Sequence, residues 1–268
     1  FHFEIRTYPE IALREALLNA FVHADYRIAG PLLVKQFRER LEISNPGGLP
    51  GGITPDNILR HEPVARNPTL VDALTRLRLV NRSNLGVRRM YQALLMEGKE
   101  PPVILDEGEA VRVIFRARDL SVSFRLFVAE EADHGRILTV EHLLILQYLL
   151  RHPEIDTATA ARITQQSESS ARETLSSMET ELGYLERGGT GRGTYWILSY
   201  DLHSRLSGPG HPDRDRRIDW EAAKTRVLSV LKQRQVNRLI HELEKEGQVR
   251  MEGHGRGARY RYVGDSGR

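Results

Sequence analysis

The sequence predicts an α+β protein in which a two-layer α/β sandwich is followed by two winged helix-turn-helix domains. Three observations predict this. Helices mix with consecutive short strands over the first 130 residues, three helices and a two-stranded hairpin follow, and part of that second block recurs 64 residues later. The chain has 268 residues, too many for one ordinary domain. We expect a sandwich domain over 1–130, winged-helix domains over 136–203 and 218–264, and a linker over 204–217.

Composition excludes several classes of protein. Hydrophobic residues make up 40% of the chain and charged residues 28%, which is typical of a globular protein, and there is no cysteine. Disulfide scaffolds, cysteine-ligated metals and thiol catalysis are therefore excluded, and a reducing cytoplasm is the expected location. No apolar run approaches the roughly 18 residues that cross a bilayer, so we expect no membrane span. Because the first residue is Phe1 and not Met, we expect the sequence to be a fragment of a longer polypeptide.

The first block combines apolar periodicity with a glycine-rich loop. Apolar spacing predicts helices over 9–26, 69–77 and 87–96, and strands over 31–37, 40–44, 102–105, 110–116 and 121–129. Residues 45–52 hold four glycines and two prolines, which rules out a helix or an inner strand there.

The second block has the element order of a winged helix-turn-helix. Helices are expected over 140–150, 157–163 and 168–182, with a turn at 165–167 and strands over 184–187 and 195–198. In that motif the second helix enters the major groove and the hairpin approaches the backbone. Ser169, Arg172 and the hairpin residue Arg192 are therefore candidate DNA contacts, although Glu168 and Glu173 would repel phosphate.

The third block repeats the glycine pattern of the second but is shorter by about 17 residues. Either this copy is degenerate, or residues are omitted between Lys232 and Gln233; we favour the omission. Glutamine, asparagine and arginine side chains can read base edges, and arginines on a hairpin can contact phosphates. The candidate DNA contacts here are Arg234, Gln235, Asn237, Arg238, Arg256 and Arg259.

Charge is unevenly distributed along the chain. Residues 187–268 carry a formal charge of +7 and the remainder −4, which gives the overall +3. A basic final third favours a polyanion partner, and double-stranded DNA is the expected one. The alternative is that the winged helices serve as protein-docking or dimerisation modules.

Several separated strings in the first block resemble one known family. They are residues 12–26 (ALREALLNAFVHADY), residues 41–53 (LEISNPGGLPGGI), and residues 65–68 (ARNP) followed by 86–90 (GVRRM). They resemble transcriptional regulators known as RecG-like ATP-dependent DNA helicase C-terminal domains, which are related to the GHKL ATPase fold of gyrase, heat-shock chaperones, histidine kinases and MutL. The resemblance covers about residues 3–102, and it implies a Schlafen AlbA-like domain upstream and winged helices downstream.

The resemblance implies roles for individual residues. Glu15 and Asn19 match the family's Glu-x-x-x-Asn helix, in which the glutamate directs the attacking water and the asparagine supports Mg²⁺. Asn45 stands where the family has an adenine-reading aspartate, followed by Gly47 and Gly48. Gly86 is what remains of the glycine-rich phosphate loop. ATP and Mg²⁺ are thus the implied cofactors, with no cofactor as the alternative, because two of the three small residues of that loop are lost and predict a pocket with little turnover.

We therefore expect a DNA-binding transcriptional regulator with a degenerate nucleotide-binding domain that senses a ligand or forms a homodimer. One alternative is a slow Mg²⁺-dependent ATPase acting in DNA transactions. Another is a non-catalytic assembly protein that has lost both functions. The chain has no P-loop, so a helicase motor is excluded.

Overall fold

The computed structural model describes residues 8–80, 85–117, 121–189, 191–206, 240–241, 243–245, 249–252 and 259–262. The chain divides into two compact units, residues 1–211 and residues 212–268. The first unit contains both the sheet and the three-helix block, so these share one unit.

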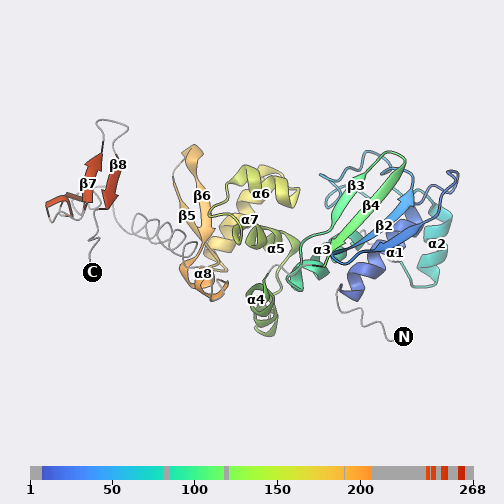
Figure 1. The fold of residues 1–268 in the computed structure, drawn as a ribbon, viewed down its shortest axis with the longest axis horizontal. Coiled ribbons are helices and arrows are strands. Elements are labelled where there is room, and N and C mark those ends of the chain that lie inside the picture. Colours follow the sequence, from blue (N-terminus) through green and yellow to red (C-terminus); the bar gives the residue numbers. More distant parts are fainter. Residues whose placement is uncertain are drawn as a thin grey trace. The chain divides into compact units, whose positions relative to one another are not determined.

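A four-stranded antiparallel sheet, with one helix packed on it and a second helix packed on the first, forms the first half of the larger unit (Figure 1). The sheet order is β1-β2-β4-β3. The elements are α1 (Glu10–His23), β1 (Leu33–Gln36), β2 (Arg40–Pro46), α2 (Pro68–Arg76), α3 (Gly86–Met96), β3 (Val103–Asp106) and β4 (Ala110–Arg116). The mixed α+β class agrees with the sequence-based expectation.

Small side chains let α1 lie close to the sheet. Ala12, Ala16 and Ala20 recur every fourth residue on one face of α1 and are all buried. Leu41 of β2 pairs in register with Phe115 of β4, and both side chains are buried in the same core. The helix face and the inner sheet face therefore close a single apolar layer.

One expected strand is a helix. Residues 121–129 were expected to be a strand, but the chain forms α4 (Val122–Asp133), with the Ser121 hydroxyl accepting a hydrogen bond from the backbone N–H of Phe124 as an N-cap. The buried residues of α4 are Phe124, Phe127, Val128 and Glu131. Their spacing of three and four is that of a helix, and it outweighs the short stretch of alternating apolar residues.

Three helices and a hairpin follow α4 in the order expected. They are α5 (Val140–Leu149), α6 (Thr157–Thr164), α7 (Glu168–Thr180), β5 (Leu185–Gly188) and β6 (Tyr195–Leu198). Ile155 forms an isolated antiparallel bridge with Trp196, which ties the α5–α6 connection to the hairpin. We refer to residues 140–198 as the three-helix module; its identity as a winged helix stays a prediction.

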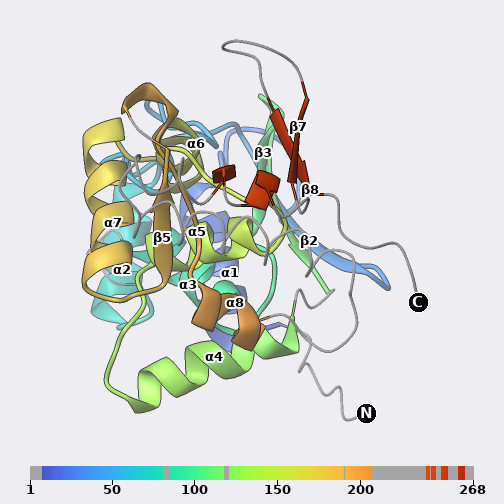
Figure 2. The ribbon, with the colours of Figure 1, turned by 90° about the vertical axis from the view of Figure 1, so that its left-hand side faces the viewer.

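A helix that the sequence did not suggest, α8 (Tyr200–Leu206), ends the described part of this unit and lies beside α4 (Figure 2). Leu202 and Leu206 are buried, and Arg205 pairs with Glu130 of α4 at 2.6 Å. The helix α8, which follows the three-helix module, thus packs against α4.

In the second unit the described residues include a hairpin of β7 (Val249–Glu252) and β8 (Arg259–Tyr262). Glu252 stands opposite Arg259 in its register. Of the helices expected in this unit, the described residues 240–241 and 243–245 are helical, and the rest, including the Lys232–Gln233 junction, lies outside the described residues.

Candidate functional site

A cavity of about 610 Å³ lies between α1, the sheet, α3 and the segment 48–72. Most of the residues predicted for the nucleotide site line it: Glu15, Asn19, Asn45, Gly48 and Gly86. These residues come from three separate strings of the sequence, so the fold brings the predicted site together. Its size is that of an ordinary small-molecule pocket.

The Glu15, Asn19 and Gly86 positions form one end of the cavity. Glu15 and Asn19 are one helical turn apart on α1, and both face the first residue of α3. A Cβ atom added at Gly86 would lie 2.9 Å from Oε2 of Glu15 and 3.6 Å from Oδ1 of Asn19. The absence of a side chain at Gly86 therefore keeps this end of the cavity open. Leu85, the N-cap of α3, gives the helix no side-chain cap, so its N-terminal N–H groups remain available to an anion.

Glu15 is not an isolated carboxylate. Its Oε1 lies 3.7 Å from Nη1 of Arg89, one turn into α3, and the Glu15 side chain is 18% exposed. The string that contains Arg89 was singled out in the sequence, but no role was assigned to it. Position in the GVRRM string is the only sequence signal that could have drawn attention to this arginine.

Asn45 offers an acceptor to the cavity. It is buried near the end of β2, and its Nδ2 donates to the carbonyl of Pro46 at 3.1 Å. Its Oδ1 has no protein partner among the residues that the structure describes. Because the amide is held with its N–H₂ group engaged, the oxygen is left to accept a hydrogen bond from a ligand amine.

The glycine-rich loop is fixed at both of its sides. Gly47 has a φ of +86°, and a Cβ there would lie 2.0 Å from Nη1 of Arg66, so only glycine fits. Arg66 in turn pairs with Asp25 at 3.4 Å and donates to the carbonyl of Gly48. On the other side, the backbone N–H of Leu49 donates to Asp106 at 3.1 Å. Gly47 itself does not line the cavity; it positions Gly48, which does.

His23 and Asp25 lie at the end of α1, and His23 also lines the cavity. Asp25 also accepts two hydrogen bonds from the guanidinium of Arg27, at 2.9 and 2.8 Å, and one from its backbone N–H at 3.1 Å, and these hold the pKa of its carboxyl well below the usual range. Burial, together with the charge of Arg66, lowers the pKa of His23. Its Nδ1 is buried without a hydrogen-bond partner among the described residues.

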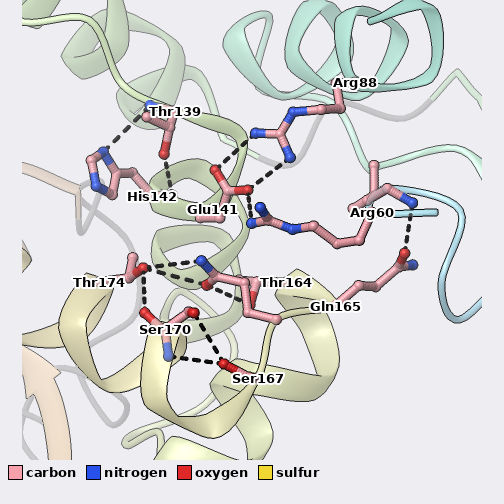
Figure 3. Close-up of polar contacts among 12 residues, drawn as sticks. Arg60, Arg88, Thr139, Glu141, His142, Thr164, Gln165, Ser167, Ser170 and Thr174 are labelled. Atoms are coloured by element: carbon pink, nitrogen blue, oxygen red, sulfur yellow. Dashed lines mark hydrogen bonds and ion pairs between the residues drawn. The ribbon is translucent and has the colours of Figure 1, made fainter. Parts of the chain in front are cut away.

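The cavity wall is bonded to the three-helix module through Glu141 of α5 (Figure 3). Glu141 is buried and accepts hydrogen bonds from both sides of the cavity: Arg88 of α3 donates at 2.9 and 3.1 Å, and Arg60 of the segment 48–72 pairs with it as well. Burial alone would raise the pKa of Glu141, but the hydrogen bonds from Arg88 and the two guanidinium charges outweigh it and lower the pKa. The sequence did not indicate this junction.

Gln165, in the turn between α6 and α7, binds the same wall. Its Oε1 accepts from the N–H of Leu59 at 2.8 Å, and its Nε2 donates to the carbonyl of Pro55 at 2.8 Å. Gln165 has a φ of +55°, a left-handed conformation that turns the chain from α6 into α7. Residues Ile53, Ile58, His61 and Val64 of this wall segment line the cavity. The turn was expected from the sequence, but its contact with the cavity wall was not.

The site has few protein groups for a metal ion. The part of the chain that the structure describes contains no cluster of three or more His, Cys, Asp or Glu residues able to hold one. Mg²⁺ needs only one or two protein oxygens when phosphates supply the rest. The Oδ1 of Asn19 and the carboxylate of Glu15, side by side at the cavity end, fit that requirement.

The predicted DNA contacts fall into two groups. Ser169 and Arg172 are exposed on the first two turns of α7, as are the acidic Glu168 and Glu173. For Arg192 the structure describes the backbone, within a 3₁₀ turn of the hairpin, and Arg259 lies in β8. The candidates Arg234, Gln235, Asn237, Arg238 and Arg256 lie outside the described residues.

Trp196 is buried and donates to Glu179 at 3.1 Å, so it belongs to the core.

No helix within the described ranges has both the length and the apolar character needed to cross a membrane.

Comparisons with known proteins agree with the sheet-domain resemblance. Residues 30–115 match the model of a family described as "Putative ATP-dependent DNA helicase recG C-terminal". This match includes Asn45, Gly47, Gly48 and Gly86 and leaves out α1 with Glu15 and Asn19. No curated protein matches the sequence.

A solved structure is similar over most of the chain. The crystal structure of the DIP2311 protein from Corynebacterium diphtheriae is 25% identical, with a TM-score of 0.65, and the alignment covers 94% of this chain and 50% of that one. The chain therefore spans about half the length of that protein. Together the comparisons support, for residues 30–115, a domain of the RecG C-terminal-like ATPase type.

Proposed function

We propose that this protein is a DNA-binding transcriptional regulator whose cavity takes an adenine nucleotide with Mg²⁺, and whose three-helix module is a winged helix that binds double-stranded DNA. One observation carries the proposal: the segment 53–65 lines the cavity and is also hydrogen-bonded to the turn that begins α7. A ligand that displaces this segment must disturb the bonds of Gln165 or move the turn with it. The nucleotide and DNA sites would thereby be coupled.

The cavity offers complementary groups for a nucleotide. Asn45 would accept from the base amine, and Asn19 would support Mg²⁺ at the phosphates. The uncapped N-terminus of α3 at Gly86 would receive negative charge, because the helix dipole and its N–H groups favour anions there.

The DNA-binding part rests on element order and on exposed residues. The order α6, turn, α7, hairpin is that of a helix-turn-helix with a wing, and Ser169 and Arg172 are exposed at the start of α7. The formal charge of +7 over residues 187–268 would add a sequence-independent attraction to phosphate. As a homodimer, the protein would present two such modules to two half-sites, which sedimentation with and without DNA would reveal.

The test measures the coupling directly. We expect the affinity for random duplex DNA, followed by fluorescence anisotropy, to change at least fivefold when ATP and Mg²⁺ are added, within the usual range of coupling between sites. Gln165→Gly removes the bridging side chain and suits the left-handed backbone, so the variant should bind each ligand but lose the coupling. Gln36→Ala, at an exposed glutamine of β1, is the control and should keep it.

Two results would contradict the proposal. If calorimetry detects no binding of ATP with Mg²⁺, the sensing function fails. If the protein binds ATP but no duplex DNA at low salt, the chain is a nucleotide-binding protein without the DNA function. The result would then favour the alternative in which the three-helix module serves assembly with other proteins.

A slow Mg²⁺-dependent ATPase is the second candidate, because Glu15 and Asn19 lie side by side at the Gly86 end of the cavity. Phosphate release measured with excess enzyme separates it from pure sensing. An ATPase should release phosphate in wild type and lose that activity in Glu15→Gln while ATP binding persists.

A further inference from the structure

A second cavity, of about 530 Å³, opens between α1, α3 and the segment Arg78–Val80. Glu15, Val80 and Arg89 line both cavities, so the two meet at the Glu15–Arg89 ion pair. None of the sequence strings pointed to this second space.

The charged groups of the second cavity are mostly arginines. Arg14 of α1, Arg78 and Arg89 line it, and Glu15 is the one acidic residue among the described lining residues. The other lining residues are apolar apart from Gln92. Four charged groups that sum to +2 beside apolar walls make a site that favours an anion.

The guanidinium groups have spare hydrogen-bonding capacity. Arg14 makes one weak hydrogen bond, from Nη2 to the carbonyl of Leu79 at 3.5 Å, and uses few of its five donors. No hydrogen bond or ion pair involves the Arg78 side chain within the described ranges. Arg78 also holds a φ of +56°, which is uncommon for a residue other than glycine. This unfavourable conformation places a cation, rather than the glycine that the backbone prefers, at the cavity rim.

We infer that the second cavity is an anion site that receives the terminal phosphoryl groups of a nucleotide whose base lies in the first cavity. A guanidinium group can form two parallel, short hydrogen bonds to phosphoryl oxygens. Arg14, Arg78 and Arg89 can therefore bind phosphoryl groups in this cavity. The chain of phosphates would run from Gly86 past the Glu15–Arg89 pair, and Arg89 would exchange its carboxylate partner for phosphate. This inference rests on the proposed nucleotide function and names its phosphate end.

The experiment uses the whole chain and a series of ligands. Calorimetry should show affinity rising from adenosine through AMP and ADP to ATP, all measured without Mg²⁺ to isolate the protein contacts. In the double variant Arg14→Gln/Arg78→Gly, the ATP-to-adenosine affinity ratio should fall at least tenfold, equivalent to about 1.4 kcal/mol, while adenosine binding is unchanged. Arg78→Gly suits the positive φ, so this change favours the fold.

A matched control and a polyphosphate probe separate the possible failures. Arg125→Gln removes one positive charge, half of the charge lost in the double variant, from the exposed face of α4 and should leave the ratio unaltered. If adenosine does not bind wild type, the nucleotide proposal fails, and tripolyphosphate then tests the anion site alone: binding that the double variant loses supports the site. The inference is overturned if the double variant keeps the wild-type ratio, or if neither ATP nor tripolyphosphate binds.

Discussion

The carboxylate of Glu141 on α5 accepts two hydrogen bonds, of 2.9 and 3.1 Å, from the guanidinium of Arg88 on α3. The two residues are 53 positions apart in the sequence. The Glu141 side chain is 8% exposed and that of Arg88 27% exposed, so water screens the pair only partly. This pair, with Arg60, joins the cavity walls to the three-helix module.

Glu141→Gln should therefore destabilise the larger unit. The substitution keeps the shape of the side chain but leaves Arg60 and Arg88 without a counter-charge, and losing charge-assisted hydrogen bonds of this kind costs about 2 kcal/mol. Urea unfolding, followed by circular dichroism, measures the change. Glu130→Gln, at a surface pair with Arg205, is the control, and we expect a cost of about 0.5 kcal/mol there. Equal losses of unfolding free energy in the two variants would show that the Glu141 junction contributes no more to stability than a surface ion pair.

Stability should decline in acid because several carboxyl groups have lowered pKa values in the fold. The hydrogen bond from Arg136 is the main cause at Glu131, and the arginine pairs outweigh burial at Glu141. A carboxyl whose folded pKa is depressed contributes its full stability above its unfolded pKa and loses it as the pH falls through the folded value. The unfolding free energy should thus be level near neutral pH and decrease below about pH 4.5, the ordinary glutamate value.

Glu131→Gln tests this pH dependence at one site. The variant should be less stable than wild type at pH 7, and the difference should shrink as the pH falls below 4.5, because protonation removes the same charge in wild type. Thermal melting of the variant and of wild type at several pH values measures the stability difference at pH 7 and its change in acid. A difference that stays constant with pH would assign the loss to packing around the buried side chain and not to its charge.

Gly86→Ala should separate ligand binding from folding. The added Cβ would lie 2.9 Å from the flexible end of Glu15, which can move aside, and alanine favours the helix more than glycine does by about 0.5–1 kcal/mol. Stability should therefore hold or rise while ATP affinity falls about tenfold, since the methyl group fills the cavity end. Gly193→Ala, where an added Cβ meets no atom within 4 Å, is the matched control. Unchanged ATP affinity in Gly86→Ala would show that the phosphates do not bind at the N-terminus of α3.

Arg172→Ala should weaken DNA binding through the first module. Arg172 is exposed on α7, and loss of one phosphate contact should lower affinity about equally for all sequences and reduce the slope of log affinity against log salt by about 1. Glu173→Gln, its exposed neighbour, should raise affinity, because it removes from the surface of α7 a negative charge that repels the phosphates. Anisotropy over a salt series measures both. If neither variant changes the slope, α7 does not face the DNA.

Local patterns in the sequence predicted most elements of the first unit. Glu15 and Asn19 fall on one face of α1 because residues four apart share a helical face, and the glycines of residues 45–52 required a loop. Residues 121–129 were expected to be a strand because a short apolar stretch is ambiguous between the two periods. The helix became evident from which side chains the fold buries, and α8 was missed.

What only the tertiary structure decided is which distant residues meet. The sequence by itself determined the glycine loop, the Glu-x-x-x-Asn helix and the basic final third, since each depends on neighbouring residues. The convergence of Arg60 and Arg88 on Glu141, and of Gln165 on the cavity wall, joins residues 53 to 110 positions apart. Residue spacing along the chain cannot predict contacts over such separations, because the packing of the apolar core sets the distances between these segments. The charged side chains then form ion pairs with whichever groups the packed core brings close to them.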